Sequence, residues 1–316
     1  MTTTKTSTTG QPIGRFHGVI PAMPTPLTKN HEVDEEAIRR IVYFLIRNGV
    51  HGLWILGTGS GFPALTSAQR RQSLQAVLQA NQRRVPTIVG VSDTSLDQSI
   101  ANAQEAAALG ADAVSSLAPY YYSLDAIDIQ RFFEGLADAS PVPLILYHNP
   151  FNSKIPLDLK LIDTLSQHER IAGIKDSTCS IGFHLELLAQ FRDREDFCVI
   201  QGDDGAMAAA PWHGADAIVA ATPVFAPALV VQLFEAAKSG DTHLVRSIQN
   251  QCTDLLNVFT VRGSFNDSNF LAGQHAALEA IELCSRTPPR PCRSYTDSEI
   301  QSVKDILARN GILRRE

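Results

Sequence analysis

Short apolar runs alternate with longer amphipathic segments over most of the chain. The runs end at glycine, proline or polar residues, as strands of a buried parallel sheet do. In the segments between them, apolar residues such as Ile38, Ile41 and Leu45 recur at helical spacing. The predicted strands are residues 18–25 (ending in a proline-rich loop), 52–56, 87–91, 113–117, 143–147, 171–175, 197–201 and 217–220. The predicted helices are residues 35–48, 67–82, 95–109, 124–138, 157–166, 181–190, 205–212 and 226–238.

This regular succession of strands and helices predicts an α/β fold, a closed (β/α)8 TIM barrel with a C-terminal helical extension. We place the barrel at residues 15–240 and the extension, as part of the same domain, at residues 241–316. Residues 1–14 are polar and rich in threonine, so a disordered tail is predicted there. The extension carries three further helical patterns, at residues 243–258, 269–284 and 297–310.

The composition narrows the classes of function. The net charge is −6, and no cluster of lysine and arginine could follow a phosphate backbone, so nucleic acid is not an expected partner. No apolar run reaches membrane-spanning length, so no membrane partner is expected. The five cysteines are scattered and the nine histidines show no ligand spacing, which predicts a reducing compartment and no metal site. The first 14 residues lack a secretory signal; we expect a cytoplasmic protein and leave a mitochondrial location open.

The stretch from Ile171 to Thr178 places a lysine in an unusual position. It predicts a buried strand in which Ile171, Gly173 and Lys175 share one face, because side chains alternate along a strand. Burying an ammonium group is costly, and a desolvated lysine can instead lose its proton and become a nucleophile. The alternative is a lysine at a strand end that extends to water.

Polar side chains follow the predicted strands at their carboxyl ends, where (β/α)8 enzymes carry their active sites. Thr58 follows the second strand and Tyr121 the fourth, while Tyr147 and Lys175 end the fifth and sixth. An amine can attack a ketone and phenols can transfer protons, so this set fits Schiff-base chemistry. Structural alternatives exist: Tyr147 could be a core phenol, Thr58 a turn residue, and Tyr120–Tyr122 an interface patch.

The sequence around these residues resembles the dihydrodipicolinate synthase / N-acetylneuraminate lyase superfamily of class I aldolases, from about Gly18 to the C-terminus. The resemblance implies a pyruvate-dependent carbon–carbon lyase without cofactor or metal, acting as a homo-oligomer, either a dimer or a tetramer. The motifs that carry it are Gly57-Thr58, Pro119-Tyr120-Tyr121, Leu146-Tyr147-His148-Asn149-Pro150 and Gly173-Ile174-Lys175-Asp176.

The resemblance also implies a role for each matching residue. Lys175 forms an imine with the C2 ketone of pyruvate, and Tyr147 lies over that imine and transfers protons. Thr58 hydrogen-bonds Tyr147 and passes protons onward. Tyr121 completes the relay, in this family often in the site of the neighbouring subunit.

Two positions depart from the family pattern. Gly59 stands where the family usually has a second hydroxyl or amide. The family holds the pyruvate carboxylate partly by backbone N–H groups of this turn, so we expect the N–H of Gly59 to bind that carboxylate. Pyruvate binding should be weaker, because the side-chain hydrogen bond at this position is lost. Asn152 stands where dihydrodipicolinate synthases carry an arginine that binds the carboxylate of the second substrate. An amide cannot reproduce the two parallel hydrogen bonds that an arginine guanidinium makes to a carboxylate. This argues against the lysine-biosynthesis reaction.

The expected reaction is the cleavage of a 4-hydroxy-2-oxo acid to pyruvate and an aldehyde. The sequence most resembles the 4-hydroxy-2-oxoglutarate aldolase branch, which makes 4-hydroxy-2-oxoglutarate the candidate substrate. The alternatives are a dihydrodipicolinate-synthase-like synthase, a sugar-acid dehydratase or deaminase that uses the same lysine imine, and a non-catalytic barrel. The details that favour the aldolase branch are Phe62-Pro63-Ala64-Leu65-Thr66-Ser67, Leu165-Ser166-Gln167-His168, Lys175-Asp176-Ser177 and Pro291-Cys292-Arg293.

Overall fold

The computed structural model describes residues 16–313, so the tail predicted at residues 1–14 lies outside the described residues. Eight strands form one sheet, and further helices follow the last strand. The predicted α/β barrel with C-terminal helices is therefore confirmed. No helix within residues 16–313 is long and apolar enough to cross a membrane. The chain divides into two compact units, one of Pro86–Val219 with the segment up to Gly18, the other of Val19–Val85 and Ala220–Glu316.

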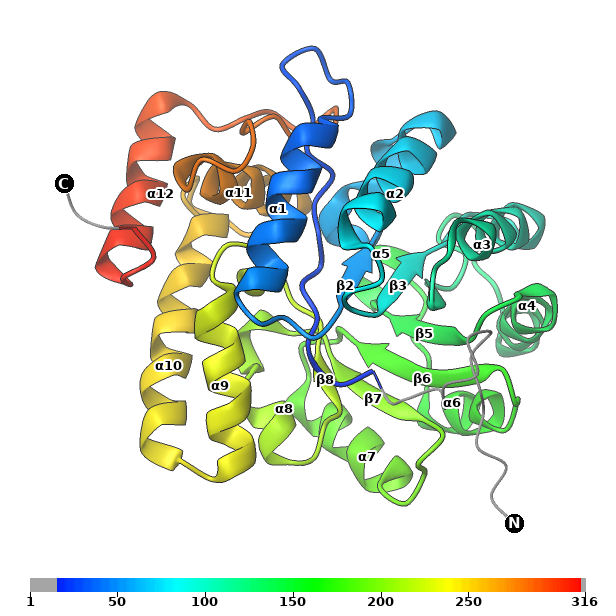
Figure 1. Ribbon diagram of the computed structural model, residues 1–316. Coiled ribbons are helices and arrows are strands. Elements are labelled where there is room, and N and C mark those ends of the chain that lie inside the picture. The colour runs from blue at the N-terminus through cyan, green and yellow to red at the C-terminus, as the bar shows by residue number, and fades with distance from the viewer. Residues whose placement is uncertain (1–15, 314–316) are drawn as a thin grey trace. The chain divides into compact units, whose positions relative to one another are not determined.

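The first unit contains the strands from β3 to β8, which lie side by side in parallel in the order of the chain. Figure 1 shows α3, α4 and α6 along the outer side of these strands. The strands are β3 (Thr87–Gly90), β4 (Ala113–Ser116), β5 (Leu144–His148), β6 (Ile171–Asp176), β7 (Cys198–Gln201) and β8 (Ala217–Ile218). The helices are α3 (Leu96–Leu109), α4 (Ala126–Ala139), α5 (Pro150–Ser153), α6 (Leu159–Ser166), α7 (Ile181–Phe191), η3 (Asp204–Ala206) and α8 (Ala209–Trp212).

The strands of this unit are apolar because both of their faces are covered, as expected for a parallel sheet. Every residue of β5 and β6 is buried. The polar residues of these two strands are concentrated at the carboxyl ends, where Tyr147 and His148 end β5 and Lys175 and Asp176 end β6. A buried polar residue is costly without a partner, so these positions are candidates for function.

The second unit combines β2 (Leu53–Ile55) with the segment that follows β1 (Gly18–Val19), through a parallel bridge between Ala22 and Trp54. Figure 1 shows α9 and α10 as an adjacent pair. Helix α11 is almost wholly buried, which makes it the core helix of the C-terminal part. The helices are α1 (Glu35–Arg47), η1 (Thr58–Ser60), η2 (Phe62–Ala64), α2 (Ser67–Asn81), η4 (Thr222–Val224), α9 (Pro227–Ser239), α10 (Thr242–Leu255), η5 (Leu256–Phe259), α11 (Asp267–Ala280) and α12 (Asp297–Arg309).

Two predicted elements are wrong in extent. The helix expected at residues 205–212 is a 3-10 turn followed by the short α8, because Pro211 has no N–H and restricts the helix before it. The strand expected at residues 18–25 is regular only at Gly18–Val19, since Pro21 and Pro24 cannot donate to a ladder. The short helix α5 was not predicted; the Asn149 side chain caps it.

Candidate active site

The lysine predicted from the sequence is buried at the end of β6. Lys175 is only 4% exposed, which excludes the alternative of a side chain that extends to water. Strand β5 runs beside β6, and their register pairs Tyr147 with Lys175. Paired residues of parallel strands point to the same face, so Nζ of Lys175 lies over the Tyr147 ring, 4.4 Å from its centroid. Two of the predicted catalytic residues are therefore in contact.

The space around Lys175 depends on Gly202, a glycine for which no role was predicted from the sequence. Gly202 follows β7, and its N–H donates to the carbonyl oxygen of Asp176 at 2.7 Å. A Cβ at this position would lie 2.8 Å from Cε of Lys175 and 2.0 Å from Oγ of Ser177. A larger residue would displace the lysine. The available signal was a glycine directly after a barrel strand, which marks close approach.

Two asparagines lie beside the Tyr147 hydroxyl. Nδ2 of Asn149 is 3.3 Å from the hydroxyl oxygen and 2.8 Å from Oδ1 of Asn152, so its two hydrogens can serve both. Asn152 is held further by its N–H, which donates to Oδ1 of Asn149 at 3.4 Å. The predicted substrate residue Asn152 is thus linked to Tyr147 through Asn149, which the sequence analysis did not select.

A buried carboxylate lies on the opposite face of β6 from the lysine. Asp176 alternates with Lys175 along the strand and meets His184 of α7, with 3.1 Å between Oδ2 and Nδ1. The N–H of Thr178 donates to its other oxygen at 3.0 Å. Nδ1 of His148 lies 3.9 Å from that oxygen, too far for a hydrogen bond. No group of three or more His, Cys, Asp and Glu residues within residues 16–313 could hold a metal ion.

His148 is neutral in this setting. The N–H of Leu157 donates to Nε2 of His148 at 3.0 Å, so the ring proton is assigned to Nδ1, which faces Asp176. Burial lowers the pKa of His148, and the nearby Asp176 carboxylate opposes this shift in part. The histidine therefore joins the end of β5 to the loop that follows α5 without adding a buried charge.

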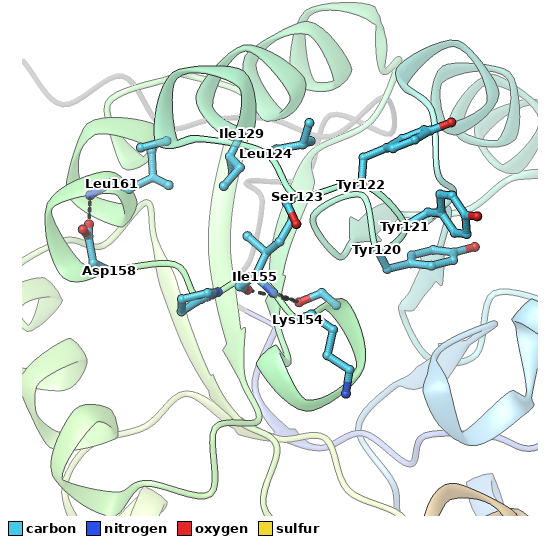
Figure 2. Close-up of a pocket in the computed structure, with 13 residues that line it drawn as sticks. Tyr120, Tyr121, Tyr122, Ser123, Leu124, Ile129, Lys154, Ile155, Asp158 and Leu161 are labelled. Carbon is cyan, nitrogen blue, oxygen red and sulfur yellow. Dashed lines mark hydrogen bonds between the residues drawn. The ribbon is translucent and has the colours of Figure 1, made fainter.

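Tyr121, the remaining predicted catalytic residue of this unit, lies on the surface. Its side chain is 77% exposed, and its ring packs edge-on against Tyr122 with 5.0 Å between centroids. Tyr120–Tyr122 border a groove of about 420 Å³, whose other walls include Lys154 and Ile155. Figure 2 shows the three tyrosine rings grouped on one side of this groove. An exposed phenol is what a role in a neighbouring subunit requires, and that role stays a prediction.

Thr58 and Gly59 belong to the second unit, in the turn that follows β2. Thr58–Ser60 form a 3-10 turn, and Oγ of Ser60 donates to the carbonyl oxygen of Gly57 at 2.7 Å. Gly61 ends the turn with φ of 70°, a conformation that favours glycine. The turn stands directly after a strand, as predicted. The hydrogen bond from Thr58 to Tyr147 and the binding roles of Thr58, Gly59 and Asn152 stay predictions.

Known proteins match this chain over nearly its whole length. The model of the dihydrodipicolinate synthetase family covers residues 15–310. An uncharacterised DapA-like lyase of Halobacterium salinarum is 30% identical over 96% of this chain and 97% of its own. YjhH of Escherichia coli, a probable 2-dehydro-3-deoxy-D-pentonate aldolase, is 29% identical over 95% of this chain and 99% of its own. The solved structure of E. coli YagE, a member of the dihydrodipicolinic acid synthase family in complex with pyruvate, has a TM-score of 0.89 at 25% identity, covering 94% and 99% of the two chains.

We predict that His148 makes the fold less stable in acid. Because its pKa is lowered from 6.5 by burial, the unfolded chain binds a proton that the folded chain does not once the pH falls below that value. The free energy of unfolding should therefore fall as the pH drops, by at most about 1.4 kcal/mol per pH unit from this group. His148→Asn removes this titration and should flatten the dependence between about pH 7 and pH 5, measured by urea denaturation.

The control for that measurement is His213→Asn, because His213 lies exposed on the surface. Parallel curves for wild type and His148→Asn over the same pH interval would contradict the prediction.

Proposed function

Since this chain belongs to the dihydrodipicolinate synthetase family of pyruvate-dependent class I aldolases, we propose that it cleaves a 4-hydroxy-2-oxo acid to pyruvate and an aldehyde. The family match confirms the predicted superfamily and the class of enzyme, a lyase. The relatives named above do not single out the 4-hydroxy-2-oxoglutarate branch. 4-Hydroxy-2-oxoglutarate remains our candidate substrate within this class.

The observation that carries the proposal is the buried Lys175 amine over the Tyr147 ring, at 4.4 Å from its centroid. A lysine in this environment is surrounded by strand residues that exclude water. An amine held in such a place can attack the carbonyl carbon of a ketone bound beside it. A phenol in contact with the same amine is placed to exchange protons with groups bound there.

The proposed reaction begins with imine formation. The amine of Lys175 attacks C2 of the 2-oxo acid to give a carbinolamine. The hydroxyl of the carbinolamine takes up a proton, the C2–O bond breaks, and water leaves as the C2=N bond forms. The product is a protonated imine that withdraws electrons from C3. Tyr147 donates the proton to the departing hydroxyl in this step.

Carbon–carbon cleavage follows from the same imine. Deprotonation of the C4 hydroxyl starts the cleavage, and the C3–C4 bond breaks to release C4 as an aldehyde. The electron pair of the broken C3–C4 bond moves toward the imine nitrogen, which leaves an enamine of pyruvate on Lys175. The enamine takes a proton at C3, and water hydrolyses the resulting imine to pyruvate and the free lysine.

Proton transfer needs a relay, since an isolated phenol is a weak base at neutral pH. We assign this relay to Tyr147, Thr58 and Tyr121, as the family resemblance implies. The Asn149 amide, 3.3 Å from the Tyr147 hydroxyl, supports the proposal because it orients that hydroxyl.

The substrate class follows from two observations. Asn152 replaces the arginine of dihydrodipicolinate synthases, which disfavours the lysine-biosynthesis reaction. The relative YjhH is named as a probable aldolase of a 2-dehydro-3-deoxy acid. Such an acid also carries a ketone at C2 and a hydroxyl at C4, so a 2-dehydro-3-deoxy sugar acid is the second candidate substrate for the same chemistry.

We propose further that two copies of the chain complete each other's sites. Tyr121 is exposed, and its edge-on contact with Tyr122 leaves the hydroxyl at the surface. Tyr122 and Phe151 are also exposed, and they supply apolar area that a second copy could cover. The homo-oligomer predicted from the sequence therefore has a candidate interface at the groove in Figure 2.

We predict that pyruvate and borohydride add a reduced pyruvyl group to Lys175. The imine forms only on a nucleophilic amine, and reduction makes it permanent. Mass spectrometry of the intact chain and its peptides measures the adduct, with Lys175→Arg as the control that should remain unmodified. An adduct on another lysine, or none, would show that the proposed mechanism is wrong.

We predict that Tyr147→Phe lowers kcat by roughly 10²- to 10⁴-fold, the usual contribution of a general acid–base group. The ring and its contact with Lys175 remain, so the melting temperature should change little. Steady-state kinetics with a 4-hydroxy-2-oxo acid and a thermal melt test both points. Near-normal turnover with reduced stability would instead make Tyr147 a structural phenol.

We predict that Tyr121 acts in the site of the neighbouring subunit. Tyr121→Phe and Lys175→Ala should each lower activity, but co-expressed mixed oligomers should regain part of it. One type of site then receives an intact tyrosine from the Lys175→Ala copy and keeps its own lysine. Activity no greater than the sum of the two separate variants would place Tyr121 in the site of its own chain, or in neither.

A further inference from the structure

A pocket of about 250 Å³ lies in the second unit, among the loop that follows β1, the start of α2 and the segment that precedes α12. Every residue that lines it belongs to this unit. Its volume is just below the roughly 300–1,000 Å³ of sites for drug-sized ligands, so the pocket suits a smaller molecule. The lining residues are Leu27, Asn30, His31, Ala64, Leu65, Gln69, Pro289 and Arg290.

The wall of this pocket carries a positive charge. Arg290 is exposed and forms no ion pair within the described part of the chain, and no aspartate or glutamate of residues 16–313 lines the pocket. The exposed amide of Asn30 adds a further donor. Leu27 and Leu65 are buried and give the wall an apolar part. A cation beside apolar surface fits an anion with a short apolar body.

The geometry of a guanidinium narrows the class of anion. Its parallel N–H groups match the two oxygens of a carboxylate, and such paired bonds are stronger than bonds between neutral groups. Arg290 lies in a turn in which the N–H of Cys292 donates to the carbonyl oxygen of Pro289 at 3.1 Å. This turn fixes the backbone from which the Arg290 side chain extends.

His31 holds an unfavourable backbone conformation at the pocket, with φ of 62°. Its N–H donates to the carbonyl oxygen of Thr28 at 2.9 Å, and its own carbonyl oxygen accepts from Nε2 of Gln69 at 2.9 Å. Nδ1 is buried without a hydrogen-bond partner within residues 16–313, whereas Nε2 is not buried. With the ring proton assigned to Nε2, the accessible nitrogen of His31 is a donor.

The pocket adjoins the turn after β2 without including the residues predicted to bind the 2-oxo acid there. A Cβ at Gly61 would lie 2.7 Å from Cγ of Pro289, so this proline packs directly against the end of the turn. Neither Thr58 nor Gly59 lines the pocket. A ligand in the pocket therefore does not take the place that the turn offers to the substrate carboxylate.

We propose that this pocket is a second ligand site, which binds a small organic carboxylate. The Arg290 guanidinium donates to both carboxylate oxygens, and Nε2 of His31 donates a further hydrogen bond. The short apolar body of the ligand lies against Leu27 and Leu65. The proposal does not depend on the proposed function, because no predicted catalytic residue lines the pocket.

A purely structural role for these residues is the competing explanation. Histidine is one of the residues that tolerate a positive φ, so His31 would then only close the loop after β1, and Arg290 would only be solvated. The two explanations differ in what a substitution changes. A loop residue affects the melting temperature, whereas a binding residue affects the Kd of a carboxylate.

The experiment uses butyrate as the probe and measures its Kd by ligand-observed NMR titration of the full chain. Pyruvate and borohydride first modify Lys175, so that the catalytic site is occupied. If Lys175 is not modified, the aldolase mechanism fails, but the same titration of the unmodified chain still tests the pocket. Butylamine has a similar apolar body with the opposite charge and should not bind. Inorganic phosphate lacks that body and should bind more weakly than butyrate.

Two substitutions assign the bound butyrate to the pocket. Arg290→Gln removes charge-assisted hydrogen bonds and should raise the Kd about 10- to 100-fold. Its matched control is Arg293→Gln, because Arg293 is an exposed arginine of the same segment that does not line the pocket. His31→Gly removes the imidazole and suits the positive φ, so the Kd should rise about 2- to 10-fold without a fall in melting temperature.

Four results would overturn the proposal. Butyrate that does not bind, or that binds equally well to Arg290→Gln, excludes this pocket as its site. An equal loss in Arg293→Gln reduces the effect to surface charge. Phosphate that binds as tightly as butyrate excludes a site for organic carboxylates. A lower melting temperature of His31→Gly, with an unchanged Kd for butyrate, makes His31 a loop residue only.

Discussion

The chemistry of this protein depends on the register between two parallel strands, β5 and β6. That register pairs Tyr147 with Lys175 on one face and His148 with Asp176 on the other. A slip of one residue would exchange the faces, because side chains alternate along a strand. The lysine would then lie against His184 and the aspartate would occupy the site. The buried contact between Asp176 and His184, with 3.1 Å between oxygen and nitrogen, opposes such a slip by holding β6 to α7.

Close backbone approach is the second constraint. A Cβ at Gly173 would lie 2.3 Å from Sγ of Cys198, and one at Gly202 would lie 2.8 Å from Cε of Lys175. These glycines let β6 and β7 pack tightly and still leave room for a long side chain at the strand end. The lysine is therefore surrounded by strands and almost wholly excluded from water.

The sequence was sufficient for features that depend on neighbouring residues. Strand parity predicted the inward position of Lys175, and the helical spacing of Ile38, Ile41 and Leu45 predicted α1, which the structure confirms. Contacts between distant segments could not be predicted in this way. Asn149 and Gln274 make hydrogen bonds whose partners depend on the folded backbone. The helix expected at residues 205–212 was wrong because helical periodicity does not account for the interruption by Pro211.

The same distinction applies to the glycine at position 59. A motif compares residues that are adjacent in the sequence, but a hydrogen bond needs only a donor at the right place in space. Gln274 stands more than two hundred positions away in the chain, and its amide oxygen would lie 3.3 Å from a Cβ at Gly59. The two residues compete for one volume, so a larger residue at one favours a smaller residue at the other. The motif alone therefore does not give the reason for a glycine here, whereas the structure shows a buried amide and a backbone oxygen that leave little room for a side chain at this position.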